Sequence, residues 1–261
     1  MVEPDLGGAF GQSDADVRFE WGPTGAALLA QGAGCLVVVD VLSFTTAVSI
    51  CVSRGMTVFP HRWDLAGAEA LARSHDAELA VRRREVSVDH PWSLSPAVLS
   101  TAPLTPRLVL PSPNGSTISA AAAEAGTVVV AACLRNATAV GRWLVAHGYG
   151  TSGHPVLIVA SGERWPDGSL RPALEDALGA GAVLHHLRTA GCSLSAEAAA
   201  TAVMFEATND VEAALRSCGS AYQMVNAGYG GDVDVAAQLD SDRSVPVLRD
   251  GAFSSSAVLS S

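Results

Sequence analysis

Short apolar runs rich in β-branched residues alternate along this chain with alanine-rich runs of helical length, and this rhythm most constrains the fold. We expect strands at residues 35–41, 56–60, 78–81, 107–111, 127–133, 155–160 and 245–248. We expect helices at residues 45–54, 64–74, 116–125, 136–147, 172–190, 195–207, 211–217 and 232–239. Strands that alternate with helices in this way predict an α/β fold, with a mostly parallel sheet and helices on both faces.

Two segments interrupt the alternation. Residues 85–106 mix prolines with polar residues and are typical of an irregular connection, which leaves open a division into two similar α/β subdomains near this boundary. Small residues dominate positions 254–261, so we expect a flexible tail there. The chain of 261 residues is otherwise expected to form one region with a sizeable core.

The charge of the chain limits the ligands it can bind. Its net charge is −10, and all sixteen of its basic residues are arginines. An acidic chain argues against a nucleic-acid partner, and the run Arg82-Arg83-Arg84 is too short to reverse this. The absence of lysine excludes mechanisms that need a Schiff-base or Walker A lysine. An anionic ligand would therefore be held by arginines, backbone N–H groups, hydroxyls or a metal ion.

Hydropathy and cysteine usage exclude further classes. Gln31 and Asp40 interrupt the longest apolar stretch, residues 26–44, so we expect no membrane partner. The first residues lack the pattern of a secretion signal, and a cytoplasmic protein is the expectation. The five cysteines are widely spaced without a CxxC pair, which favours structural thiols over disulfides or zinc. Assembly as a homo-oligomer is left open.

Polar side chains gather where predicted strands end and helices begin, which is where parallel α/β sheets bind ligands. Four stretches take such positions: Asp40 with Ser43, Thr45 and Thr46; Asn114, Gly115 and Ser116; Arg135 and Asn136; and the loop 161–176, with Glu163, Arg164, Arg171, Glu175 and Asp176. Helix N-termini and arginines suit a phosphate, which the carboxylates would face through a divalent ion. This oxygen-only ligand set favours Mg²⁺.

Each stretch taken alone has a structural interpretation. Asp40 and the hydroxyls after it are typical of a helix N-cap, and Asn114 with Gly115 is typical of a turn. Glu175 and Asp176 come at the start of a predicted helix, where acids complement the helix dipole. Only the joint placement of the four stretches favours a ligand site.

Five stretches, in this order, resemble the 2-phosphosulfolactate phosphatase family, the phosphatases of coenzyme M biosynthesis. They are VVVDVLSFTTAV, LPSPNGSTIS, ACLRNATAVG, GERWPDGSLRPALEDALGAGAV and YGGDVDVAAQLDSDRSVPVL, and they cover most of the chain. The resemblance implies an α/β hydrolase of phosphate monoesters that requires Mg²⁺. Its substrate would be a small anionic 2-phospho acid that bears a sulfonate.

The resemblance also assigns roles. It implies that Asp40, Arg164 and Glu175 are catalytic, and that Asp40, Glu163 and Asp176 hold the metal. The expected substrate-binding residues are Ser43, Thr45, Thr46, Asn114, Gly115, Ser116, Arg135, Asn136 and Arg171. Two reaction paths stay open: attack by a metal-activated water, which we favour, and attack by Asp40 to give an aspartyl-phosphate.

Two departures from the family pattern concern the substrate. Family members commonly carry an arginine after DVL, where this chain has Ser43, and LRPA is inserted ahead of Glu175. A second anionic group of the substrate would then be held differently, for example by Arg171. Two alternatives therefore stay open: a phosphatase of another phosphorylated acid, and a non-catalytic small-anion-binding or regulatory protein.

Overall fold

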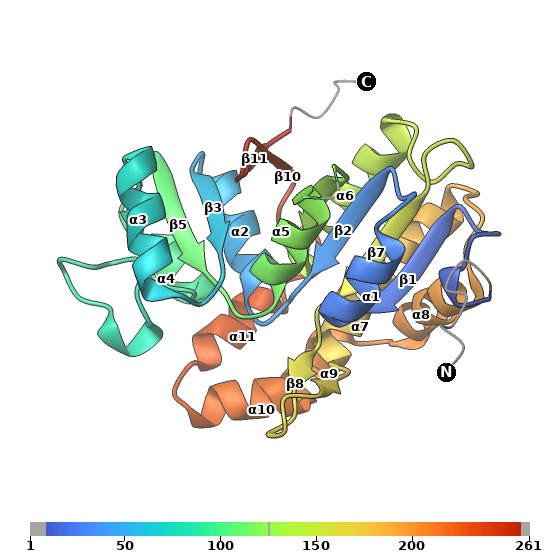
Figure 1. The fold of residues 1–261 in the computed structure, drawn as a ribbon. Coiled ribbons are helices and arrows are strands. Elements are labelled where there is room, and N and C mark those ends of the chain that lie inside the picture. Colours follow the sequence, from blue (N-terminus) through green and yellow to red (C-terminus); the bar gives the residue numbers. More distant parts are fainter. Residues whose placement is uncertain (1–8, 125, 257–261) are drawn as a thin grey trace.

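A nine-stranded sheet forms the centre of the computed structural model, which describes residues 9–124 and 126–256. The strand order is β1-β7-β2-β6-β10-β11-β3-β5-β4, and helices cover both faces (Figure 1). Parallel pairing dominates, and only the pairs made by β10 and β11 are antiparallel within this sheet. The expected α/β fold with a mostly parallel sheet is confirmed.

Four parallel strands form one part of the sheet. They are β1 (Val17–Trp21), β7 (Val156–Ala160), β2 (Cys35–Val39) and β6 (Val128–Ala132). All five residues of β2 are buried, and its successive side chains point to opposite faces. Val37 and Val39 join one hydrophobic cluster, whereas Leu36 and Val38 join another. A strand covered on both faces is expected to be apolar throughout, as the run CLVVV is.

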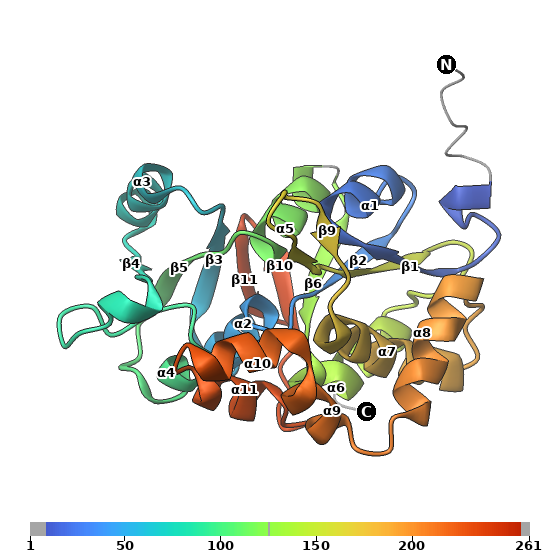
Figure 2. The ribbon, with the colours of Figure 1, turned by 90° about the horizontal axis from the view of Figure 1, so that it is seen from below.

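Helices form a layer on each face of these strands. The helices α1 (Gly22–Leu29) and α5 (Gly115–Glu124) lie on one face (Figure 2). The opposite face carries α6 (Ala137–Ala146), α7 (Leu174–Thr189) and α8 (Ala196–Ala207). Among the described residues, no helix is long and apolar enough to cross a membrane.

The second part of the sheet holds three shorter or more exposed strands. They are β3 (Thr57–His61), β5 (Arg107–Pro111) and β4 (Glu78–Leu79). The connection 85–106 lies between β4 and β5 in the sequence and contains the unexpected helix α4 (Pro96–Thr101). β3 and β4, before this connection, both pair with β5, which follows it, so one sheet holds the strands on both sides of the connection.

An antiparallel hairpin joins the two parts. It consists of β10 (Pro246–Arg249) and β11 (Ala252–Ser255), which pair with β6 and β3 respectively. Its two-residue turn, Asp250-Gly251, has φ of +51° and +80°, the left-handed geometry that this dipeptide favours in tight hairpins. The expectation of a tail from residue 254 is wrong for residues 254 and 255, which continue β11. Positions 257–261 lie outside the described residues.

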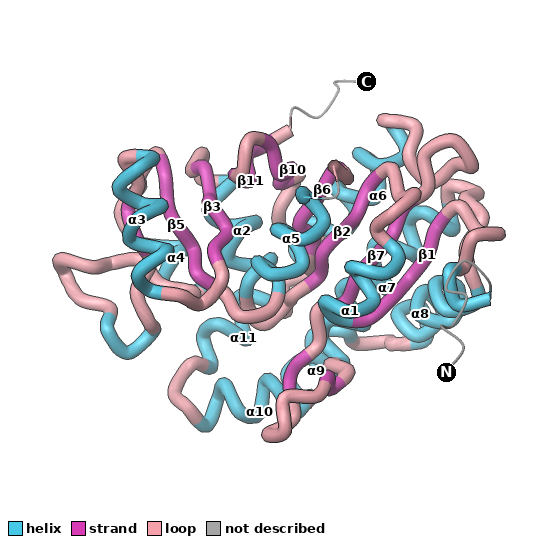
Figure 3. Tube along the Cα trace, viewed as in Figure 1, coloured by secondary structure: helices cyan, strands magenta, loops and turns pink. Residues whose placement is uncertain are grey.

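Five further helices lie around the sheet. They are α2 (Phe44–Ser53), α3 (Leu65–His75), α9 (Val211–Ser217), α10 (Gly219–Asn226) and α11 (Gly230–Ala236). Figure 3 shows α9, α10 and α11 following one another through short loops. A small hairpin of β8 (Glu163–Arg164) and β9 (Leu170–Arg171) follows β7. β1, α1 and α10 were not expected from the sequence.

Candidate active site

Three loops meet at the carboxyl ends of β2, β5 and β7. The backbone N–H of Gly115 donates to Asp40 Oδ2 at 2.9 Å, which joins the β5 loop to the β2 loop. Asn114 Nδ2 donates to the Gly162 carbonyl at 3.3 Å, which joins the β5 loop to the loop after β7. Glycine is required at 115, because a Cβ there would collide with the Phe44 ring and lie 2.9 Å from Asp40 Oδ2. Three of the four sequence stretches thus meet at one edge of the sheet.

Asp40 is buried at the entrance to α2, with 6% of its surface exposed. Its Oδ1 accepts the N–H of Phe44, the first residue of α2, at 3.2 Å, while its Oδ2 accepts from Gly115. Asp40 therefore does cap the helix, as one interpretation of the sequence held. It also links two loops, which a simple cap does not require.

Asp176 plays a similar linking role in the first turn of α7. Its Oδ1 accepts the N–H of Val41 at 2.7 Å, and its Oδ2 accepts the N–H of Gly162 at 2.8 Å. This buried carboxylate thus ties the loop after β2 to the loop after β7. Buried backbone N–H groups need acceptors, so Asp176 is part of the framework of the site.

Glu163 and Glu175 offer their carboxylates differently. Glu175 is buried, and its Oε2 accepts from the Cys218 thiol with a sulfur–oxygen distance of 3.2 Å. Glu163 is half-buried in β8, and its side chain accepts no hydrogen bond from another side chain of the described residues; the N–H of the adjacent Arg164 lowers its pKa against the dominant effect of burial. These two acids keep carboxylate oxygens that the framework does not use.

The four acids share one buried, negatively charged environment. Burial raises the pKa of Asp40 to about 6, against the lowering effect of its two backbone N–H bonds. Burial, followed by the charges of Asp40 and Glu175, raises the pKa of Glu163 to about 7 and holds that of Asp176 well above its usual range. Several carboxylates that disfavour one another's ionised form would be stabilised by a bound cation.

The donor chemistry fits Mg²⁺, although the acids do not form a complete cage. Within residues 9–124 and 126–256, no three His, Cys, Asp or Glu side chains are already arranged as ligands of one ion. Mg²⁺ commonly uses one or two carboxylates, several waters and substrate phosphate oxygens, so a complete protein cage is not needed. Glu163 and Glu175 supply oxygens of the required type.

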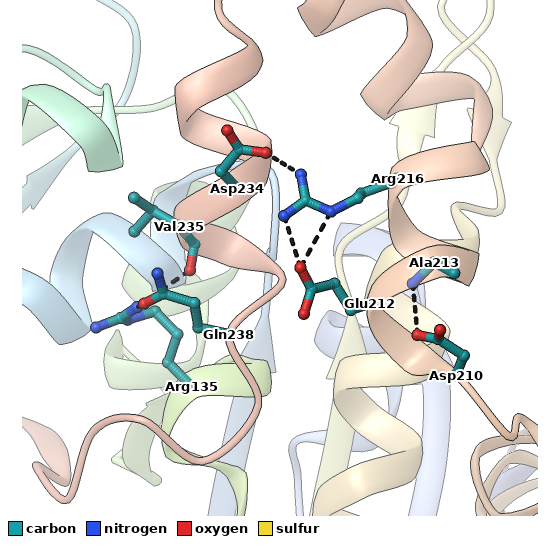
Figure 4. Close-up of polar contacts among 8 residues, drawn as sticks. All are labelled: Arg135, Asp210, Glu212, Ala213, Arg216, Asp234, Val235 and Gln238. Carbon is teal, nitrogen blue, oxygen red and sulfur yellow. Dashed lines mark hydrogen bonds and ion pairs between the residues drawn. The ribbon is translucent and has the colours of Figure 1, made fainter.

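The three arginines expected at the site have different surroundings. Figure 4 shows Arg135 turned towards α11, where its guanidinium donates to the Val235 carbonyl at 3.1 Å and to Gln238. Arg164 donates to the Gly168 carbonyl within its own hairpin at 3.0 Å. Arg171 donates to Ser220 Oγ at 2.8 Å, and its positive charge lowers the pKa of Glu163 against the dominant effect of burial. Of the three arginines, Arg171 is thus the one whose charge acts on an acid of the site, Glu163.

The expected hydroxyl and amide ligands mostly bond to the backbone. Thr45 Oγ1 and Thr46 Oγ1 donate to the carbonyls of Asp40 and Val41, both at 2.8 Å. Ser116 Oγ donates to the Ser112 carbonyl. The Asn136 amide bonds to the backbone at Cys133, Ala131 and Ser244, at 2.9, 3.3 and 3.2 Å. These side chains shape the loops. Gly115 bonds directly to the Asp40 carboxylate, Asn114 bonds to Gly162 beside Glu163, and Ser43 accepts from Arg83.

Sequence reasoning missed three polar residues around this site. Arg83 donates to Ser43 Oγ at 2.7 Å, although it belongs to the basic run that was set aside as too short. Asp232 pairs with Arg83, with 2.8 Å between Oδ2 and Nε, and Cys218 bonds to Glu175. All three contacts join residues 40 or more positions apart, so local sequence patterns carried no signal for them.

Comparisons with known proteins cover the same stretches. A family model described as 2-phosphosulpholactate phosphatase matches residues 26–251. A curated protein of Deinococcus radiodurans, named "Probable 2-phosphosulfolactate phosphatase", is 30% identical over 229 residues, which span 82% of this chain and 88% of that protein. The family match runs from α1 to the turn between β10 and β11 and includes all four acids.

Proposed function

The chain belongs to the 2-phosphosulfolactate phosphatase family, and on this premise we propose that it is a Mg²⁺-dependent phosphatase of a small anionic 2-phospho acid. The candidate substrate is 2-phosphosulfolactate, which would give sulfolactate and inorganic phosphate. One observation carries the proposal: four acids from the β2, β7 and α7 segments share one buried environment at the ends of the strands.

The two pairs of acids suit different tasks. Glu163 and Glu175 would hold Mg²⁺ together with phosphate oxygens of the substrate, because their carboxylates are the less engaged ones. Bound there, the ion would offset the negative charge of the acids and of the phosphate and so assist displacement at phosphorus. Asp176 would keep the loops in place through its two backbone N–H bonds.

Asp40 suits the role of general base. Its carboxylate is fixed by two backbone N–H bonds, and its pKa, raised by burial to about 6, lies near neutral pH. In the proposed step a water oxygen attacks phosphorus, Asp40 accepts the proton of that water, and the ester bond to the hydroxy acid breaks. The leaving alkoxide takes a proton from solvent. Attack by Asp40 itself is the alternative path.

Phosphate release from a panel of phosphomonoesters, with Mg²⁺ or with EDTA, tests the proposal. We expect turnover of 2-phosphosulfolactate with Mg²⁺ and its loss in EDTA. Asp40→Asn should lower kcat by about a hundredfold or more, as loss of a general base does. Asp89→Asn, a change at an exposed acid, is the matched control and should keep full activity.

Three other outcomes would contradict the role of Asp40 or favour one of the alternatives. Full activity of Asp40→Asn would contradict the role of Asp40 as base. A phosphorylated enzyme, trapped by acid quench, would favour attack by Asp40. If no ester is hydrolysed but inorganic phosphate raises the melting temperature, the chain is a small-anion-binding protein instead.

A further inference from the structure

Arg83 enters the site from a segment outside the motifs discussed above. The segment that follows β4 makes a bridge between Val81 and Ser93 and carries Arg83 to the N-terminus of α2. There its Nη2 donates to Ser43 Oγ at 2.7 Å and to the Leu94 carbonyl at 3.0 Å. Ser43 occupies the N-cap position of α2, three positions after Asp40, so the guanidinium lies at the border of the acid site.

Asp232 of α11 fixes the orientation of this guanidinium. Its Oδ2 accepts from Arg83 Nε at 2.8 Å, while its Oδ1 accepts from Ser95 Oγ and from the N–H of Ala97 at 3.1 Å. With 1% of its surface exposed, Asp232 is a buried carboxylate whose two oxygens are both engaged. A charge-assisted hydrogen bond of this kind fixes the orientation of the guanidinium plane.

The same helix is itself held from both sides. Arg216 of α9 donates to Asp234 of α11 and to Glu212, as Figure 4 shows. On the other side, Arg135 donates to the carbonyl of Val235. α11, which carries the Asp232 carboxylate, thus contacts α9 through Arg216 and the loop after β6 through Arg135.

One end of the Arg83 guanidinium stays available. Nη1 donates to none of the described residues, and 20% of the side chain is exposed. The guanidinium also lies over the Tyr229 ring, 5.3 Å from its centroid, which limits its rotation. Its positive charge opposes the rise that burial causes in the pKa of Asp40, so its field reaches the centre of the site.

We propose that Arg83 binds the second anionic group of the substrate, the carboxylate or sulfonate carried beside the phosphate, and that Asp232 positions its guanidinium for this contact. The inference rests on the proposed phosphatase function. Nη1 has two N–H donors, and a planar guanidinium pairs well with carboxylate or sulfonate oxygens. Arg83 thereby supplies a positive charge at the very helix start where this chain has a serine, Ser43.

A pair of esters that differ in one charged group tests this role. 2-Phospholactate carries a carboxylate beside its phosphate, whereas isopropyl phosphate has a methyl group in that place. We expect Arg83→Lys to lower kcat/KM for 2-phospholactate by about tenfold or more, mainly through KM, because a charge-assisted hydrogen bond is lost. For isopropyl phosphate the loss should stay below about threefold. A loss confined to 2-phosphosulfolactate would assign the contact to the sulfonate.

Two further variants separate binding from structure. Arg84→Lys changes the neighbouring exposed arginine and should leave both substrates unaffected. Asp232→Asn should reproduce the substrate-dependent rise in KM, because it loosens Arg83 without removing it. Equal losses on both esters, in Arg83→Lys and Asp232→Asn alike, would mean that the pair only stabilises the fold and would overturn the proposal.

The wild-type enzyme gives a test that needs no variant. It should prefer 2-phosphosulfolactate, which carries both anionic groups, over isopropyl phosphate by about tenfold or more in kcat/KM, and a ratio near one would overturn the proposal even if Arg83→Lys failed to fold. Absence of turnover for every ester would instead contradict the phosphatase function itself. The two failures are therefore distinguishable.

Discussion

The two aspartates of the site differ from its two glutamates in what their oxygens do. Asp40 and Asp176 accept two backbone N–H bonds each, one on each carboxylate oxygen. Glu175 accepts only from a thiol, and Glu163 accepts from no side chain in the described part of the chain. The two aspartates thus tie separate loops together through backbone N–H groups, whereas the two glutamates link no loops in this way.

The difference also separates stability from ligand binding. A carboxylate that satisfies two buried N–H groups stabilises the loops, and its removal leaves those groups without acceptors. A carboxylate with unused oxygens in a negatively charged cluster destabilises the fold when it is ionised, and a cation reverses that effect. Stability should therefore respond in opposite ways to the removal of Asp176 and of Glu163.

Asp176→Ala should give the largest effect. It removes the acceptors of the Val41 and Gly162 N–H groups, and we expect the free energy of unfolding to fall by about 2–5 kcal/mol. Glu163→Ala should not lower it and in EDTA should raise it, because no buried donor loses its acceptor and an ionised carboxylate leaves the acidic cluster. Urea denaturation at neutral pH in EDTA measures both values. Equal destabilisation by the two variants would remove the distinction between the pairs.

The dependence of stability on pH should give a smaller effect. The pKa of Glu163 rises from 4.5 to about 7 on folding, chiefly through burial, so the folded state keeps a proton that the unfolded state releases. Between these values the free energy of unfolding therefore falls as pH increases. Asp40 contributes in the same direction. Glu163→Gln should flatten this slope in EDTA, measured as urea midpoints at pH 5 and pH 8; an unchanged slope would contradict the assignment.

Local patterns predicted the parts of the molecule that local forces determine. The apolar run before Asp40 predicted β2, and the run of helical length from Thr45 to Gly55 predicted α2, within a few residues of their ends. The turn Asp250-Gly251 carried a usable hairpin signal, but it was not recognised, and β11 was missed with it. The order of the strands depends on this hairpin, which no alternation of strands and helices indicates.

The site was predictable as a set of loops but not as a set of contacts. Asp40 and the acids of α7 could be placed at strand ends because parallel strands bring those ends together. Which arginine lies beside them could not be predicted, since Arg83 and Ser43 are 40 positions apart and meet only through the segment after β4. Arg135 and Arg164, which lie in the expected loops, bond elsewhere.

Substitution of Cys218, the donor to Glu175, should give the smallest change in kcat/KM. Its thiol is the single side-chain donor to Glu175 within the described residues, and burial raises its pKa to about 12, so it stays protonated and donates at neutral pH. Cys218→Ala should therefore lower kcat/KM by about two- to threefold through the misplaced Glu175 carboxylate, whereas Cys218→Ser keeps a donor and should stay near wild type. Cys192→Ala, at a half-buried thiol away from the acids, is the control and should leave activity unchanged. Equal losses in the alanine and serine variants would show that packing around Cys218, rather than its hydrogen bond, positions Glu175.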